Sequence, residues 1–146
     1  MLLRIQSDLR LEGITFDGAS KAEYAIYSQA RRPNTLIVED CQFHDIVGDA
    51  ISGDPEVTLG WCEVTDSKFH DIGHRALGFS SAEMIRNLLV SNSTFHRIGT
   101  AIEVTEKDEP TFVRISDATV HEAREGIVLR DVTDAQVSGV SLSTIK

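Results

Sequence analysis

Apolar and polar residues alternate in short segments along this chain, and the segments return at nearly constant intervals. Six of them align: LEGITF (11–16), VEDCQF (38–43), VTDSKF (64–69), VSNSTF (90–95), ISDATV (115–120) and VSGVSL (137–142). Their last positions are 27, 26, 26, 25 and 22 residues apart. A nearly fixed period over most of a chain indicates a repeat protein, in which each repeat forms one structural unit that stacks on the next.

Each repeat begins with the pattern of a strand that has one buried face. The first aligned column is apolar (Leu11, Val38, Val64, Val90, Ile115, Val137), and so is the column two residues upstream (Leu9, Leu36, Cys62, Leu88, Val113, Ala135). The residues between these columns are mostly polar, which is the period-two alternation of a strand. The third column holds Gly13, Asp40, Asp66, Asn92, Asp117 and Gly139, residue types that favour a bend.

After the bend, each repeat returns to apolar positions. One column holds Phe16, Phe43, Phe69, Phe95, Val120 and Leu142, and the column three residues further on holds Ala19, Ile46, Ile72, Ile98, Ala123 and Ile145. A third short strand follows, headed by Ile26, Ile51, Leu77, Ile102 and Ile127, and only residues 82–87 show a weak helical pattern. We expect the phenylalanines and isoleucines to point inward and to stack on the same residue of the neighbouring repeats, about 4.8 Å away.

Short strands, bends between them and one repeat every 22–27 residues describe a solenoid of stacked coils. The pattern resembles the right-handed parallel β-helix, the pectate-lyase-like superfold, over nearly the whole chain. We therefore expect an all-β protein: a single-stranded, right-handed parallel β-helix of about six coils. Residues 1–146 would form one β-helix domain, either complete or part of a longer solenoid.

Composition narrows the choice of partners. The 146 residues carry a formal net charge of −9, which disfavours nucleic acid and anionic membrane surfaces. No apolar run is long enough to span a bilayer, and the start MLLRIQSDLRLEG is charged from Arg4 onward, so no signal peptide is expected. The chain would be cytoplasmic or a domain of a longer secreted protein. Cys41 and Cys62 stand in different columns, and we expect both to be reduced core residues.

Four of the five histidines fall in one further column, here called the histidine column. His44, His70, His96 and His121 each lie between two inward positions, so we expect a ladder of imidazoles that points outward. Such a ladder can shield the turn and hydrogen-bond to neighbouring carboxylates, bind a metal ion or supply a general base. The sequence favours the structural role and assigns no metal, because the column faces solvent without a preformed cage.

Within the superfold, LRLEGITFDG and VEDCQFHDI are most similar to coils of the chondroitinase-B and alginate-lyase branch. The resemblance implies a polyuronide lyase with a lysine base, an arginine one coil later and commonly Ca²⁺, which together offset the negative charge of the carbanion. Arg130 in GIVLRD occupies roughly the arginine position, but Thr105 stands where the lysine would be and Lys107 is displaced into the loop. Lys107 and Arg130 are therefore the only catalytic candidates, and no cofactor other than this Ca²⁺ is expected.

The sequence indicates a binding surface more clearly than an active site. Thr15, Gln42, Lys68, Thr94 and Thr119 form an outward polar file near the histidine column, and Trp61 with Phe112 could stack on sugar rings unless the variable loops cover them. We expect a noncatalytic β-helix module that is structural or binds a polysaccharide. The alternatives are a polyuronide lyase, supported by the resemblance, and a tailspike-like or fibrous assembly subunit. Open ends of the solenoid would favour self-association, because exposed strand edges pair readily.

Overall fold

The computed structural model describes residues 1–29, 32–54, 58–79, 84–105 and 111–146. Within these residues the protein is all-β, and parallel strands stack into a β-solenoid of about five turns. The six-stranded sheet contains β2 (Leu9–Glu12), β5 (Asn34–Glu39), β8 (Thr58–Thr65), β10 (Met84–Ser91), β12 (Phe112–Ser116) and β14 (Asp134–Ser138). The nine-stranded sheet contains β1 (Leu3–Ile5), β3 (Thr15–Asp17), β4 (Tyr24–Ser28), β6 (Gln42–Ile46), β7 (Asp49–Gly53), β9 (Lys68–Phe79), β11 (Thr94–Thr105), β13 (Thr119–Arg130) and β15 (Ser141–Ile145).

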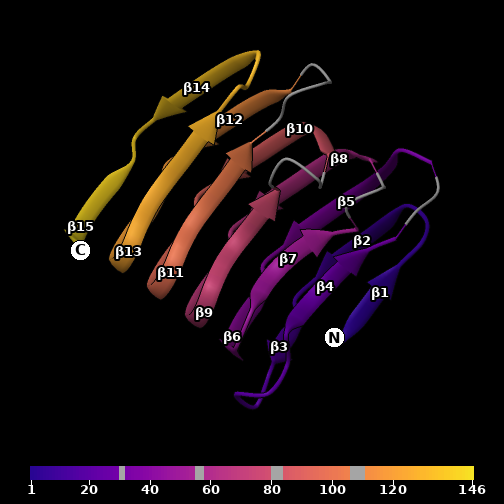
Figure 1. The fold of residues 1–146 in the computed structure, drawn as a ribbon, viewed down its shortest axis with the longest axis horizontal. Helices are drawn as coiled ribbons and strands as arrows, with labels where there is room; N and C mark the ends of the chain where they lie inside the picture. Colours follow the sequence, from indigo (N-terminus) through magenta and orange to yellow (C-terminus); the bar gives the residue numbers. More distant parts are fainter. Residues whose placement is uncertain (30–31, 55–57, 80–83, 106–110) are drawn as a thin grey trace.

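The turns follow one another along the solenoid in chain order. Figure 1 shows them side by side, with the two termini at opposite ends of the stack. The six-stranded sheet runs β2-β5-β8-β10-β12-β14, with one strand for each of the six expected coils, and the solenoid has about five turns. The all-β parallel solenoid predicted from the sequence is thereby confirmed.

The phenylalanine column forms a stack through the core. Phe16, Phe43, Phe69 and Phe95 pair in register on neighbouring strands. Successive ring centroids lie 4.8, 4.7 and 5.0 Å apart, and the rings are within 7° of parallel. These separations equal the spacing of hydrogen-bonded strands, so the repeat of the backbone sets the repeat of the rings. Val120 and Leu142 continue the column toward the C-terminal end.

Two columns of left-handed residues turn the corners of each coil. The expected bend column has positive φ throughout, with values between 48° and 67° (Gly13, Asp40, Asp66, Asn92, Asp117 and Gly139). A second column follows the four histidines and, in the last turn, Ser143; its φ values lie between 52° and 56° (Asp45, Asp71, Arg97, Glu122 and Thr144). The left-handed residue interrupts the alternation of side chains, which lets residues three apart, such as Phe43 and Ile46, both face the core.

The third predicted strand is separate only in the first turns. There it forms β4 and β7, whereas in later turns it joins the second strand in β9, β11 and β13, which have 12 residues each. Positions 73 and 99, which directly follow core isoleucines, must be glycine because the backbones of neighbouring turns approach closely there. A Cβ at these positions would collide with the backbone carbonyl oxygens of Val47 and His74.

Two further expectations from the sequence are wrong at least in part, and one is confirmed. Ala19, assigned to an inward column, is exposed in a turn with φ of 49°. The weak helical pattern at 82–87 is wrong from Met84 onward, where β10 begins, and residues 82–83 lie outside the described residues. Cys41 and Cys62 are free and buried as expected, and burial raises the pKa of the Cys62 thiol to about 12.

The last turn leaves its apolar columns uncovered. Val137, Leu142 and Ile145 are exposed, although the equivalent residues of the preceding turns are buried. Self-association through this edge stays a prediction. In the part of the chain that the structure describes, no helix has the length and hydrophobicity needed to cross a membrane.

Candidate functional site

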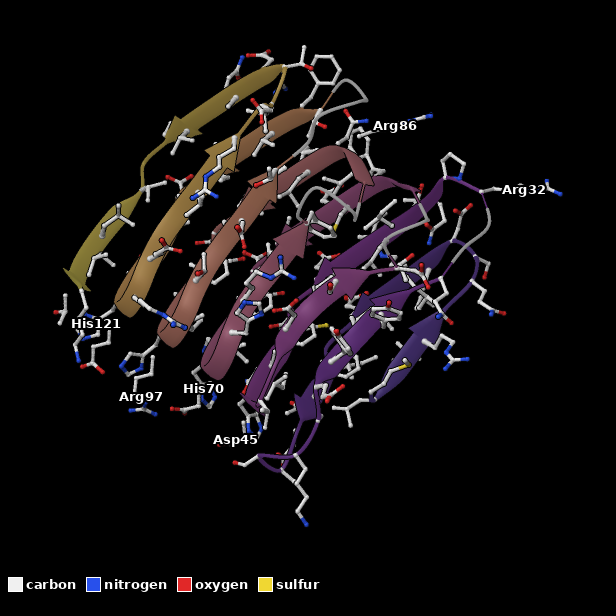
Figure 2. All side chains as sticks on the ribbon, viewed as in Figure 1. Arg32, Asp45, His70, Arg86, Arg97 and His121 are labelled. Atoms are coloured by element: carbon white, nitrogen blue, oxygen red, sulfur yellow. The ribbon has the colours of Figure 1, made fainter. Side chains whose placement is uncertain are left out.

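The histidine column lies along the outer side of one corner of the solenoid. Parallel pairing aligns His44 with His70, His70 with His96 and His96 with His121. Figure 2 shows His70, Arg97 and His121 in a row along this edge. The rings fall into two pairs. The centroids of His44 and His70 are 5.0 Å apart with nearly parallel planes, whereas those of His96 and His121 are 5.2 Å apart with planes tilted by 33°.

The two pairs meet carboxylates through different ring nitrogens. His44 Nδ1 lies 2.7 Å from Asp45 Oδ2, and His70 Nδ1 lies 2.9 Å from Asp71 Oδ2, so each of these rings contacts the residue that follows it. In the second pair both Nε2 atoms face one carboxylate. Glu122 lies 3.5 Å from His96 Nε2 and 3.3 Å from His121 Nε2.

Arg97 links the turn of the second pair to the turn of the first. Its Nε and Nη2 atoms donate to Oδ1 and Oδ2 of Asp71 at 2.6 and 2.8 Å, a bidentate contact between neighbouring turns. The hydrogen bond from Arg97 holds the pKa of the Asp71 carboxyl well below its usual range, and the hydrogen bond with His70 acts in the same direction. Asp71 is therefore charged at neutral pH, and its carboxylate holds the Arg97 guanidinium at the corner that carries the histidine column.

Asp71→Asn is expected to make the protein less stable at pH 7, because it removes the carboxylate that Arg97 binds. Asparagine tolerates the left-handed backbone at this position, so the substitution adds little strain. A carboxyl with a lowered folded pKa stabilises the fold above its ordinary pKa of about 3.9 and loses this contribution as pH falls. The difference between the urea midpoints of the two proteins, measured from pH 7 to pH 3, should be constant down to about pH 5 and narrow progressively below about pH 4, as pH falls toward the lowered folded pKa. A constant difference would show that the charge is not responsible.

Trp61 and Phe112 form an aromatic column on the outer face of the six-stranded sheet. Trp61 is paired with Asn87, and Asn87 with Phe112, so the two aromatic side chains lie two strands apart in one register position. Trp61 is 37% exposed and Phe112 is 45% exposed. Both side chains are therefore accessible, which the interpretation as a stacking surface for sugar rings requires.

Polar groups surround this aromatic column. Trp61 Nε1 donates to Glu63 Oε2 at 3.3 Å, and Thr35 lies beside Trp61 on the adjacent strand. A groove of about 550 Å³ opens at the corner of the first turns, where the chain enters β2 and β5. It is lined by Gln6, Ser7, Asp8, Gln29, Arg32, Pro33 and Asn34. The outer face thus combines two flat apolar rings with hydrogen-bonding groups.

The polar file expected beside the histidines is also in register. Thr15, Gln42, Lys68, Thr94 and Thr119 follow one another on neighbouring strands, and all are exposed. This face carries no exposed aromatic side chain among the described residues. It offers hydrogen bonds without a stacking platform.

A buried ionic cluster is the main feature that the sequence did not reveal. Asp49, with a side chain 2% exposed, binds Arg75, with a side chain 8% exposed, through Nη2–Oδ2 at 2.5 Å and two Nε contacts of 3.1 Å. Glu103 Oε2 lies 3.4 Å from Arg75 Nη1, and His74 Nδ1 lies 2.9 Å from Asp49 Oδ1. The available signal was the separation of 26 residues, one repeat, between opposite charges. All these groups have partners, so we interpret the cluster as a link between turns.

The two lyase candidates are not brought into a visible site. Arg130 is exposed at the end of β13, where it pairs with Thr105. Lys107 lies outside the described residues. The lyase interpretation stays a prediction.

Comparisons with known proteins do not assign a function to these sites. No family model matches the chain, and no match is found among curated proteins or solved structures.

Proposed function

We propose that this β-solenoid is a noncatalytic module that binds a neutral polysaccharide along the outer face of its six-stranded sheet. The observation that carries the proposal is the aromatic column, in which Trp61 and Phe112 are exposed in one register position. Ligand sites combine apolar and aromatic surfaces with a few placed polar groups, and this face has both.

The spacing of the rings supports an extended chain as ligand. Two strand spacings place Trp61 and Phe112 about 9.6 Å apart along the sheet. This is close to the length of two sugar residues in an extended β-linked glycan, so alternate sugars could pack their apolar faces on the two rings. Asn87 lies between them; its Nδ2 donates to the Gly60 carbonyl at 3.3 Å, and its Oδ1 is left to accept from the intervening sugar.

The polar groove lies at the corner of the first turns and is lined in part by Asn34, the neighbour of Thr35 in the chain. Its lining is mostly polar, and Thr35 continues the aromatic column toward that end of the sheet. The ligand is inferred to be neutral because the protein carries a net charge of −9, which repels polyuronides and sulfated glycans.

Binding to soluble neutral β-glucans, mannans and xylans is expected to retard the protein in affinity gels, with alginate and chondroitin sulfate as acidic comparisons. Trp61→Ala and Phe112→Ala should each weaken binding to the selected glycan at least tenfold, or about 1.4 kcal/mol, because each removes one stacking platform. Isothermal titration with an oligosaccharide of that glycan gives the dissociation constants.

Lys68→Ala and Thr94→Ala are the matched controls, since both residues are exposed on the outer face of the other sheet. They should bind the glycan as the unmodified protein does. Unchanged affinity of the double variant Trp61→Ala/Phe112→Ala would refute the aromatic column as the site. Absence of retardation by every neutral glycan would refute the proposed function.

A further inference from the structure

The second half of the histidine column brings three metal-binding side chains together from two adjacent turns. His96 belongs to β11, and His121 and Glu122 belong to β13. One donor atom from each residue can be chosen such that all three lie within 4.8 Å of one another. We propose that His96, His121 and Glu122 bind a zinc ion at this corner.

The contacts of Glu122 with the two imidazoles are close to the donor spacing of a zinc site. Zinc bonds of about 2.0–2.1 Å at tetrahedral angles place neighbouring donor atoms about 3.3–3.4 Å apart. Glu122 Oε2 lies 3.5 Å from His96 Nε2, and Glu122 Oε1 lies 3.3 Å from His121 Nε2. One donor atom from each of the three residues lies within 4.8 Å of the others, so a small movement of the side chains would bring a single carboxylate oxygen and both imidazoles onto one ion. An ion between them would keep a fourth position for water, because the three side chains are partly exposed or exposed.

Ser143 orients one of the imidazoles. Its Oγ lies 2.8 Å from His121 Nδ1, on the opposite side of the ring from Glu122. When Nδ1 donates to this hydroxyl, the lone pair of the neutral ring is on Nε2, which faces the carboxylate. A hydrogen bond to the second ring nitrogen is the usual support for a histidine that binds a metal.

The backbone holds the ligands in place. His96 and His121 are paired in register on neighbouring strands, and Glu122 is fixed in the left-handed corner with φ of 54°. The neighbouring cation Arg97 is bound by both carboxylate oxygens of Asp71 and is attracted more weakly by Glu122, so Asp71 holds most of its charge. Two imidazoles and one carboxylate favour zinc and other late first-row metals over Ca²⁺ or Mg²⁺, which prefer oxygen donors.

Among the described residues, a second group combines Asp17, His44 and Asp45. It has a single imidazole, whose Nδ1 already contacts Asp45 at 2.7 Å, and His44 stacks on His70. The site with two imidazoles is therefore the one we assign.

Titration of the full chain, prepared without a histidine tag, with Zn²⁺ against a chromophoric zinc indicator is expected to show one saturable site. His96→Ala, His121→Ala and Glu122→Gln should each weaken zinc binding at least tenfold, and Ser143→Ala by about tenfold through loss of ring orientation. His70→Ala is the matched control from the same column and should bind as the unmodified protein does. Circular dichroism checks that each variant is folded.

A long-range ¹H–¹⁵N spectrum of the unmodified protein tests the ligands without substitution. Zn²⁺ should shift the Nε2 resonances of His96 and His121 and leave His70 unchanged. Absence of saturable binding would overturn the proposal, and so would loss of binding in His44→Ala with retention in His96→Ala. The glycan test uses the opposite sheet, so the two proposals fail independently.

Discussion

Phe69→Ala is expected to lower the free energy of unfolding by about 3–5 kcal/mol. Phe69 is 1% exposed and lies in the middle of the phenylalanine stack, with neighbouring centroids 4.7 and 5.0 Å away. Its removal leaves a cavity that the rings on either side cannot fill, because the pairing of their strands fixes their positions. The expected loss is a large share of the roughly 5–15 kcal/mol by which domains are stable.

Urea unfolding followed by circular dichroism measures this loss. Phe112→Ala provides the matched control, because the same residue type is removed from an exposed position, and its effect should be within about 0.5 kcal/mol. Phe69→Leu, which keeps most of the volume, should fall between the two. If Phe69→Ala were as stable as Phe112→Ala, the stack would not be a major source of stability.

Arg75→Met is expected to destabilise the protein by about 3–5 kcal/mol, because it leaves the Asp49 carboxylate buried without its main partner. The side chain of Asp49 is 2% exposed, and in the variant it would keep the Nδ1 of His74 and the backbone N–H of residue 75 as neighbours. These contacts do not replace three charged contacts from the guanidinium.

The double variant Asp49→Asn/Arg75→Met tests the cause. Neutralising Asp49 removes the isolated charge, so the double variant should recover part of the stability lost in the single variant. Urea midpoints of the three proteins at pH 7 provide the comparison. Equal losses in the single and double variants would assign the effect to packing of the Arg75 side chain over Gly78 instead.

The sequence predicted the parts of the fold in which the residue type determines the position. The phenylalanine column and the bend column were predictable because buried aromatics repeat in phase and because glycine, aspartate and asparagine tolerate positive φ. The second left-handed column was not, since it includes Arg97 and Glu122, which rarely adopt this conformation. The weak helical pattern at 82–87 was misleading from Met84 onward, because strands of parallel sheets can be apolar on both faces and then lack a clear alternation.

Much less of the candidate site could be predicted. The register of the histidines follows from the repeat, but the contacts of Glu122 with His96 and His121 depend on side-chain directions at a corner whose backbone was not foreseen. The pairing of Asp49 with Arg75 likewise requires knowledge of which polar side chains turn toward each other between coils. The aromatic column was correctly placed in one register position, whereas its exposure needed the structure.

The in-register stacking of turns restricts how the length of such a chain can change. An insertion of a single residue within a strand shifts every later side chain of that strand to the opposite face, which would misplace whole columns at once. Duplication of a complete turn, by contrast, preserves each column and lengthens the solenoid by about 4.8 Å. Length in this architecture is therefore quantised: evolution or design can add or delete whole turns, or vary the connecting loops, but few intermediate lengths are accessible.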